Sequence, residues 1–186
     1  MKDKDVEHLY KLQDFFQVSI NRVKKSIIKL QNGEPYIRYR FILSSKHLWN
    51  ILNSYGCTPK KSLSLEFPDL NIFKDKLLVR HFIRGYIDGD GSIGFYQNVS
   101  LSCLGTKNFL NGLLNFLEPR NLFENHHSDT TFVFKFSGVK AVAYLYHLYY
   151  KSTIYLERKY QIFNKIKDCR FKEKSLKLLE SKIGEG

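Results

Sequence analysis

The chain has 186 residues, which is enough for one domain with a real core or for two small ones. Its formal net charge of +12 favours a polyanionic partner, because each phosphate that a protein neutralises releases counterions. Three widely spaced cysteines without a CxxC pair support neither a zinc ribbon nor a disulfide framework, and they indicate a reducing, intracellular setting. No run of about 18 apolar residues and no apolar leader is present, so we expect no membrane span, membrane partner or secretion.

The first part of the chain predicts two helices that flank a pair of strands. These elements are a helix over 3–16, strands over 18–30 and 35–43, and a helix over 45–55. Asn32 and Gly33 form a strong turn signal between the strands. Ser44 or Ser45 is expected to cap the second helix, which Gly56 ends.

A linker over 57–74 leads to the elements of the second part. A helix opens at Asp75 and ends in the glycine cluster 89–91, and a hairpin follows at once. The remaining pattern predicts a helix capped by Thr106, a short strand over 121–123, a loop over 124–129, a strand over 131–136, helices over 139–150 and 154–167, and a charged helix after 169.

The register of the hairpin follows from its side chains. A two-residue turn would mix polar and apolar residues on each face. A three-residue loop over 96–98 instead pairs Phe95 with Val99 and Ile93 with Leu101, and we expect this register because one consistent apolar face specifies a sheet. The other face then carries Ser92, Gly94, Ser100 and Ser102.

The order helix, strand, strand, helix occurs twice, which indicates an incomplete repeat. Residues 40–44 are similar to residues 135–137, and an amphipathic helix follows each of these segments. The first copy lacks the helix and hairpin that open the second. We therefore expect a partial first half over 1–68, a complete half over 69–168 and a charged tail over 169–186.

Residues 83–91 read IRGYIDGDG and place two carboxylates, Asp88 and Asp90, among glycines at a helix end. The simplest interpretation is a helix stopped by Gly89 and Gly91, with Asp88 bonded to nearby backbone. However, an acid at the negative end of a helix dipole is unfavourable. A bound divalent cation would supply the reason for two acids there.

This nine-residue segment resembles the motif of the LAGLIDADG homing endonucleases. Residues 56–68 are similar to the connector between the two halves of such proteins, and 155–160 with Phe163 resemble their C-terminal helix. The resemblance implies an α+β fold built from an αββαββα unit used twice. Its two motif helices pack together, and its saddle-shaped antiparallel sheets lie over the DNA major groove.

Several residue roles are implied by the resemblance alone. Asp90, with Gly89 beside it, would bind Mg²⁺ or Mn²⁺ and act in catalysis. Asp88 would be a structural acid and Gly85 a contact residue, both at the helix interface. Lys61 and Lys159 lie in the family-like flanking stretches and are catalytic candidates, although surface lysines are the alternative.

Candidates for contact with DNA come from both sets of strands. The serines of the polar hairpin face are suited to modest contacts with base edges, and basic strand residues to phosphate or guanine contacts. The alternative for each is an ordinary solvated strand face. The candidates are Lys24, Lys25, Lys29, Arg38, Arg40, Ser92, Ser100, Ser102 and Lys135.

The chain departs from the family pattern in having one motif, which lies mid-chain where a second motif would lie. Three explanations stay open: a missing N-terminal segment, a first motif supplied by a separate chain, or a degenerate remnant. We expect a complementary N-terminal fragment or a second copy as partner.

The expected function is site-specific, metal-dependent cleavage of double-stranded DNA. The alternative is a non-cleaving nucleic-acid binder, either an intron RNA maturase or a DNA-binding regulator, with RNA the less expected partner. A third reading is an endonuclease domain excised from an intein. The expected setting is intracellular, in an organelle, a phage-infected cell or bacterial cytoplasm.

Overall fold

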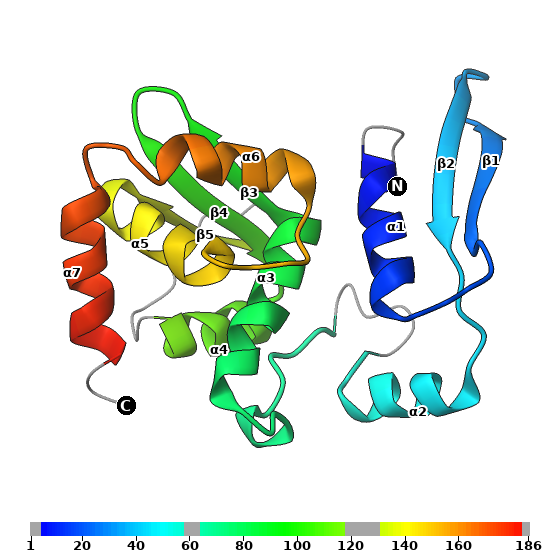
Figure 1. Cartoon of the computed structure of the whole chain (residues 1–186), viewed down its shortest axis with the longest axis horizontal. Coiled ribbons are helices and arrows are strands. Elements are labelled where there is room, and N and C mark those ends of the chain that lie inside the picture. The colour runs from blue at the N-terminus through cyan, green and yellow to red at the C-terminus, as the bar shows by residue number, and fades with distance from the viewer. Residues whose placement is uncertain (1–4, 58–63, 118–130, 184–186) are drawn as a thin grey trace.

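The computed structural model describes residues 5–57, 64–117 and 131–183, which form two units (Figure 1). The N-terminal unit, 5–57, contains α1 (Val6–Phe15), β1 (Val23–Lys29), β2 (Pro35–Phe41) and α2 (Lys46–Ser54). The C-terminal unit, 64–183, contains η3 (Leu70–Ile72), η4 (Lys76–Leu78), α3 (Val79–Asp90), β3 (Gly91–Phe95), β4 (Val99–Gly105), α4 (Lys107–Leu117), β5 (Phe132–Ser137), α5 (Gly138–Tyr149), α6 (Glu157–Ile166) and α7 (Lys172–Ile183). The predicted α+β class is confirmed.

The helix boundaries follow from the capping residues that the sequence offers. Ser45 accepts a bond from the Leu48 amide at 3.1 Å, and Gly56 ends the same helix with a φ of +78°. Thr106 accepts from the Phe109 amide at 3.2 Å and so caps α4. Each cap satisfies backbone groups that have no partner inside the helix, as predicted.

The strands form two antiparallel sheets, β1–β2 and β3–β4–β5. Phe95 lies opposite Val99 and Ile93 opposite Leu101, so the three-residue hairpin loop is confirmed. The face that carries Leu101 and Cys103 points into the core, and the serine face points away from it. The expected strand over 121–123 lies outside the described residues.

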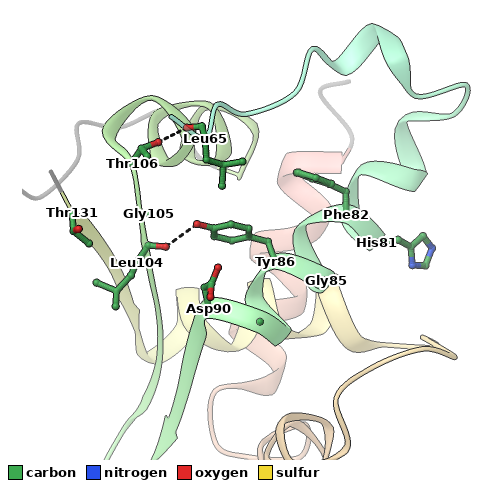
Figure 2. A pocket seen from close by; sticks show the side chains of 11 residues that line it. Leu65, His81, Phe82, Gly85, Tyr86, Asp90, Leu104, Gly105, Thr106 and Thr131 are labelled. Atoms are coloured by element: carbon green, nitrogen blue, oxygen red, sulfur yellow. Dashed lines mark hydrogen bonds between the residues drawn. The ribbon is translucent and has the colours of Figure 1, made fainter. Parts of the chain in front are cut away.

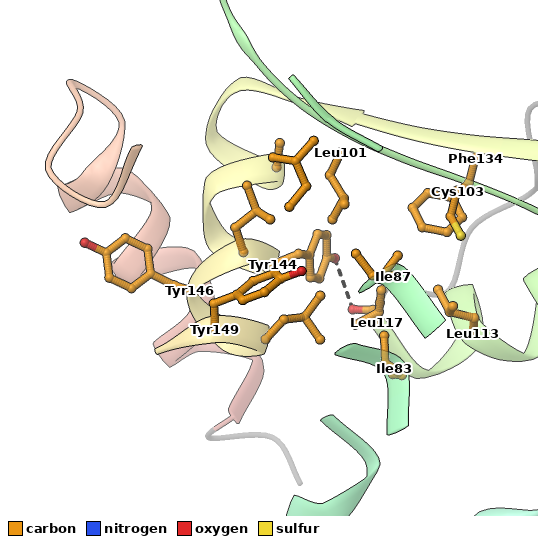
Figure 3. Packing of buried hydrophobic residues seen from close by; sticks show 14 of the residues in the cluster. Ile83, Ile87, Leu101, Cys103, Leu113, Leu117, Phe134, Tyr144, Tyr146 and Tyr149 are labelled. Carbon is orange, nitrogen blue, oxygen red and sulfur yellow. Dashed lines mark hydrogen bonds between the residues drawn. The ribbon is translucent and has the colours of Figure 1, made fainter. Parts of the chain in front are cut away.

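The main apolar core belongs to the C-terminal unit and surrounds α5 (Figure 3). Helix α5 is buried from Ala141 to Tyr146 and again at Leu148 and Tyr149. Ile83 and Ile87 of α3 meet this core with no exposed surface, and each such side chain contributes about 1.5–3 kcal/mol.

The segment expected as a charged tail forms α7, which packs on α5. Its Ser175 is fully buried and donates to the Val139 carbonyl at 2.9 Å.

The N-terminal unit is covered far less completely. Its α1 packs on the hairpin, where Phe16 stacks on Phe41 at 6.1 Å between ring centroids. Helix α2 has no buried residue, although its sequence is amphipathic, and the side chain of Trp49 is 57% exposed. Leu52 and Tyr55 are exposed on the same helix and just after its end.

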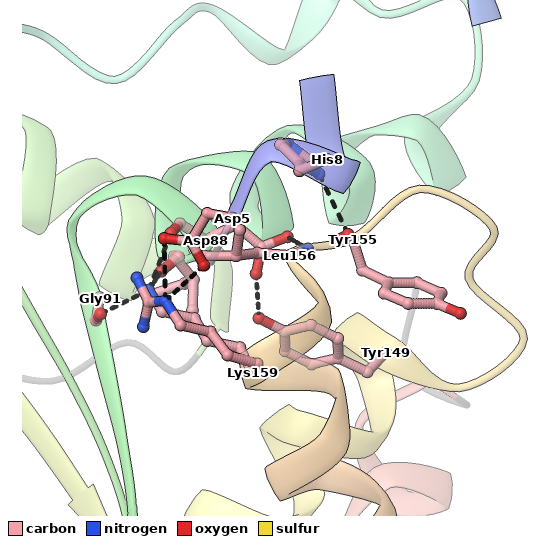
Figure 4. Close-up of polar contacts among 10 residues, drawn as sticks. Asp5, His8, Asp88, Gly91, Tyr149, Tyr155, Leu156 and Lys159 are labelled. Atoms are coloured by element: carbon pink, nitrogen blue, oxygen red, sulfur yellow. Dashed lines mark hydrogen bonds and ion pairs between the residues drawn. The ribbon is translucent and has the colours of Figure 1, made fainter. Parts of the chain in front are cut away.

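Polar contacts of α1 join the two units next to α6 (Figures 1 and 4). His8 Nδ1 donates to the Tyr155 carbonyl at 3.1 Å, and Lys11 pairs with Glu157 at 2.9 Å. Asp5 and Arg158 form a second ion pair of 3.2 Å. In the described part of the chain, no helix combines the length and the apolar character that a membrane span requires.

Candidate functional site

The motif helix α3 passes into β3 without a loop, because Gly91 allows a very close approach. A Cβ atom at Gly91 would lie 2.6 Å from the Ile87 carbonyl oxygen. Gly91 has a φ of −83°, and Gly89 lies inside the helix, so neither is the left-handed helix stop that the simplest interpretation of the motif required. Glycine serves here to bring helix and strand together.

Asp90 is the last residue of α3, and its side chain is exposed. Within the described residues, no donor or cation bonds to its carboxylate. Tyr86 and Cys103 lie close enough to sense its charge. Burial, with a smaller contribution from Asp90, raises the pKa of the Cys103 thiol to about 12 and raises the pKa of Tyr86 as well. Both neighbours are therefore neutral at ordinary pH, and the nearby positive charge that acts on Asp90 is that of Lys159.

A cleft of about 680 Å³ opens between α3 and the start of α4, and Asp90 stands at its edge (Figure 2). The Tyr86 hydroxyl crosses it to donate to the Leu104 carbonyl at 2.9 Å, and Thr106 bonds to the Leu65 carbonyl. A smaller hollow of about 180 Å³ lies next to it, lined by Asp90, Ser92, Ser102, Cys103, Leu104 and Val133. Asp90 thus borders both the cleft and the outer face of the sheet.

Asp88 points to the opposite side of α3, into its own unit (Figure 4). It accepts from the Tyr149 hydroxyl at 2.6 Å and from the Leu156 amide at 3.1 Å. Burial raises the pKa of Asp88, and these two donors act against that rise. The acid is structural, but it lies on the buried side of the helix, away from the face where contact with a second helix was expected.

Gly85 and Gly89 lie on the exposed face of α3. Nothing lies within 4 Å of the place where a Cβ atom would be at either glycine. The face is therefore open to the close approach of another backbone, as the placement of Gly85 at a helix interface requires.

Lys159 of α6 is 2% exposed and supports the end of α3 (Figure 4). Its ammonium donates to the carbonyls of Ile87, Asp88 and Gly91, at 2.9 Å for Asp88 and 2.6 Å for Gly91. These are carbonyls at the negative end of a helix, where a cation is favourable. In this position the ammonium is turned inward rather than toward a substrate, so Lys159 is placed as a positioning residue and not as the expected catalytic one. Lys61 lies outside the described residues.

The polar face of the three-stranded sheet unites the predicted strand residues of this unit. Ser102 lies opposite Ser92 on β3 and opposite Lys135 on β5, and Ser100 lies one step further toward the hairpin loop. Lys135 is exposed. The face leads directly to Asp90, because β3 begins at the residue after it.

The basic residues of the N-terminal hairpin are divided between its two faces. Lys24 lies opposite Arg40, and Arg38 shares their face. Lys25 and Lys29 share the face of Phe41, which α1 packs against. Neighbouring residues in a strand point to opposite sides, so the five predicted residues cannot form one surface.

Arg38 is also notable for a buried Nε atom. Among the buried side-chain nitrogen and oxygen atoms of the described residues, this Nε alone has no hydrogen-bond partner. Such a donor is usually satisfied in folded proteins.

Tyr149 and Lys159 show what the pattern of residues could not reveal about the site. Tyr149 lies 61 positions from its partner Asp88, and Lys159 lies 68 positions from Gly91. Tyr149 reads as ordinary helix packing in the sequence. The sequence indicates only that Tyr149 and Lys159 belong to helices that follow the motif.

The exposed carboxylate of Asp90 is an oxygen donor of the kind that Mg²⁺ accepts. Mg²⁺ keeps several water ligands and needs only one or two protein carboxylates. In the described ranges no three His, Cys, Asp or Glu side chains lie close enough together to hold a metal ion. Comparison with protein-family models gives no match, and neither does comparison with curated proteins.

Proposed function

We propose that the protein is a site-specific, metal-dependent endonuclease of the LAGLIDADG type that acts on double-stranded DNA. The observation that carries this proposal is the position of Asp90. An exposed carboxylate without a described partner ends the motif helix, and it joins a cleft to a serine-lined sheet face. An acid at the negative end of a helix is unfavourable, and a bound cation would offset that cost beyond what Lys159 supplies.

Mg²⁺ or Mn²⁺ would be held by Asp90, with the main chain of Gly89 beside it. When bound, such an ion supplies an activated water and stabilises the leaving oxygen of a phosphodiester. The chain's own residues position the carboxylate: Lys159 holds the carbonyls on either side of Asp90, and Gly91 lets the helix enter the strand directly.

Two surfaces are suited to DNA. The outer face of β3–β4–β5 offers serine hydroxyls and Lys135 next to Asp90, where hydroxyls can bond to base edges or phosphates. In the N-terminal hairpin, Lys24, Arg38 and Arg40 share the face opposite α1. Lys24 and Arg40 of this face are exposed, as contacts with phosphates require.

The proposal includes a partner, either a complementary N-terminal fragment or a second copy. Helix α5 is the buried centre of the C-terminal unit, whereas α2, its counterpart in the repeat, has no buried residue. The difference supports a partner segment that packs on α2 in the way that α3 and the β3–β4 hairpin pack on α5. Gly85 and Gly89 support a second helix on the open face of α3.

The test is metal-dependent cleavage of a randomised double-stranded DNA library by the wild type and by Asp90→Asn. Cuts at a recurring long site that need Mg²⁺ and disappear in Asp90→Asn are the expected result. Glu173→Gln, an exposed change of a carboxylate on α7, is the control and should cut as the wild type does.

The outcomes also separate the partner question from the chemistry. Nicking of one strand is expected where the chain acts without its partner, since it offers one carboxylate. Full double-strand cleavage by a monomer would contradict the proposed need for a partner. Salt-sensitive binding without any cutting would favour the non-cleaving binder, which the single carboxylate also permits.

A further inference from the structure

Helix α5 ends in an exposed aromatic ring. Leu148 and Tyr149 are fully buried, whereas the next residue, Tyr150, is 53% exposed. The Tyr150 ring lies 6.1 Å from the Tyr146 ring between centroids, and the Lys151 ammonium lies 5.5 Å from the centroid of the Tyr150 ring. An aromatic ring and an ammonium therefore lie together at the surface, directly after a buried helix.

Lys151 lies beside this ring in a conformation that favours glycine. Its φ is +54°, a left-handed value that crowds a Cβ atom. The turn is fixed, because the amide and the hydroxyl of Ser152 both donate to the Tyr149 carbonyl, at 3.1 and 2.7 Å. Glycine would relieve the strain, so folding alone does not account for a lysine at this position. Residues in such conformations cluster at functional sites.

The turn between α6 and α7 is attached to the same part of α5. The Tyr146 hydroxyl donates to the Lys167 carbonyl, and this bond fastens the turn to the helix (Figure 3). Arg170, three residues after Lys167 in the chain, is exposed, and its guanidinium lies 4.8 Å from the centroid of the Phe171 ring. The turn thus brings a second pairing of a cation with an aromatic ring to this surface.

The charge of the turn favours an anionic ligand. From 165 to 174 the chain has five basic and two acidic residues, so the excess is positive. Lys172 lies close enough to Tyr150 to interact with it electrostatically, and one of the acids, Asp168, pairs with Lys172 at 2.6 Å. An exposed aromatic ring among basic side chains suits a single strand, in which bases that can stack alternate with phosphates.

This surface lies apart from the face proposed for duplex DNA. Helix α5 packs on β4 from the side of the apolar core, whereas the serines of the sheet point away from that core. Tyr150 and the α6–α7 turn belong to the helical side of the unit. A duplex on the serine face would therefore leave them free.

We propose that the surface formed by Tyr150, Lys151 and the α6–α7 turn binds single-stranded nucleic acid. A base stacks on the exposed ring of Tyr150, and the ammonium of Lys151 beside that ring contacts the adjoining phosphate. The basic groups of the turn continue the contact with the backbone. The inference does not depend on the proposed endonuclease function, because it involves neither Asp90 nor the sheet.

The test is a titration of a short labelled single-stranded oligonucleotide, as DNA and as RNA, with the full chain, followed by fluorescence anisotropy at fixed salt. Unlabelled duplex is present in excess to occupy the proposed DNA face. We expect Tyr150→Leu to bind about tenfold more weakly, because stacking is lost, and Tyr150→Phe to bind as the wild type does. The matched control is Tyr96→Leu, which removes a tyrosine that is 90% exposed on the hairpin loop and should not change the affinity.

Lys151→Gly separates recognition from folding. Glycine accepts the left-handed conformation, so the urea midpoint of this variant should stay the same or rise, while its affinity for the oligonucleotide falls. Lys74→Gly, at an exposed position outside the helices and strands, should leave the affinity unchanged.

Binding of either strand with this pattern of variants supports the proposal, and the tighter of the two strands identifies the ligand as DNA or RNA. Equal affinity of the wild type and Tyr150→Leu, or complete displacement of the strand by the duplex, overturns it. Competition by polyglutamate as strong as by unlabelled oligonucleotide would assign the surface to an acidic protein, and it would overturn the proposal as well.

Discussion

The Nζ atom of Lys159 lies 2.6 Å from the carbonyl oxygen of Gly91 and also bonds to the carbonyl of Asp88. One ammonium on α6 therefore holds the main chain on both sides of Asp90. The carboxylate of Asp90 is free to meet a ligand while its backbone is fixed. Preorganisation of this kind comes from a residue that does not itself contact the ligand.

Replacement of Lys159 by Met should destabilise the protein by about 2–4 kcal/mol, because the carbonyls of Ile87, Asp88 and Gly91 lose the bond to a buried ammonium while the volume is kept. The free energy of unfolding in urea measures this. Lys165→Met, an exposed change on the same helix, should leave it nearly unchanged. Equal unfolding free energies for the two variants would show that Lys159 does not support the helix end.

Tyr149→Phe removes the hydroxyl that donates to Asp88 at 2.6 Å, and we expect a loss of about 1–3 kcal/mol at neutral pH. Burial raises the pKa of Asp88, so its protonated form favours folding at low pH and this contribution is lost as the pH rises through the raised pKa. Without the Tyr149 donor the pKa rises further, so the loss should grow with pH.

Urea unfolding of the two proteins over a pH series measures this growing difference, with Tyr150→Phe as the exposed neighbouring control. A loss that does not depend on pH would mean that the hydroxyl serves packing and not the carboxylate.

His147 should make the protein less stable in acid. Its pKa is lowered from 6.5 by burial and by Arg80 and His81, so the unfolded chain takes up the proton first. The stability that the neutral form contributes is complete above about pH 6.5 and falls as the pH drops below that value. His147→Gln should flatten this part of the stability profile, whereas exposed His47→Gln should not. A profile equally steep in both variants would assign the acid sensitivity elsewhere.

Gly85→Ala should separate folding from assembly. Alanine in an open helical position should stabilise the folded chain by about 0.5–1 kcal/mol, because nothing lies within 4 Å of the added methyl group. The same methyl group should weaken the proposed helix contact and reduce partner-dependent cleavage at limiting protein concentration. Unfolding measurements and cleavage assays test the two effects.

Gly112→Ala provides the opposite case, since its methyl group would lie 2.3 Å from Phe67 Cβ and should destabilise α4. Unchanged cleavage by a stabilised Gly85→Ala protein would argue against a helix partner at this face.

The sequence predicts the fold where the determining interactions are local. The caps at Ser45 and Thr106 bond within three residues, and the register at Phe95 and Val99 follows from alternation across one loop. Both are confirmed because short-range stereochemistry leaves few alternatives.

The site is predictable only in part. Asp90 is conspicuous because an acid is unfavourable at the C-terminal end of a helix. The functions of Lys159 and Asp88, in contrast, depend on contacts between residues more than sixty positions apart. A lysine that caps a helix in three dimensions is indistinguishable in the sequence from a surface or catalytic lysine. Lys24 and Lys25 lie on opposite faces of their strand because neighbouring strand residues alternate, a separation that the sequence pattern alone implies.

The contact between α1 and the segment around Tyr155 can form only late in the synthesis of the chain. His8 emerges from the ribosome 147 residues before the carbonyl that it binds. At about 5–20 residues per second, this leaves the first helix without its partner for about 7–30 s. During that interval the N-terminal unit is synthesised but lacks its contact with the segment around Tyr155, so chaperones and neighbouring nascent chains can reach it.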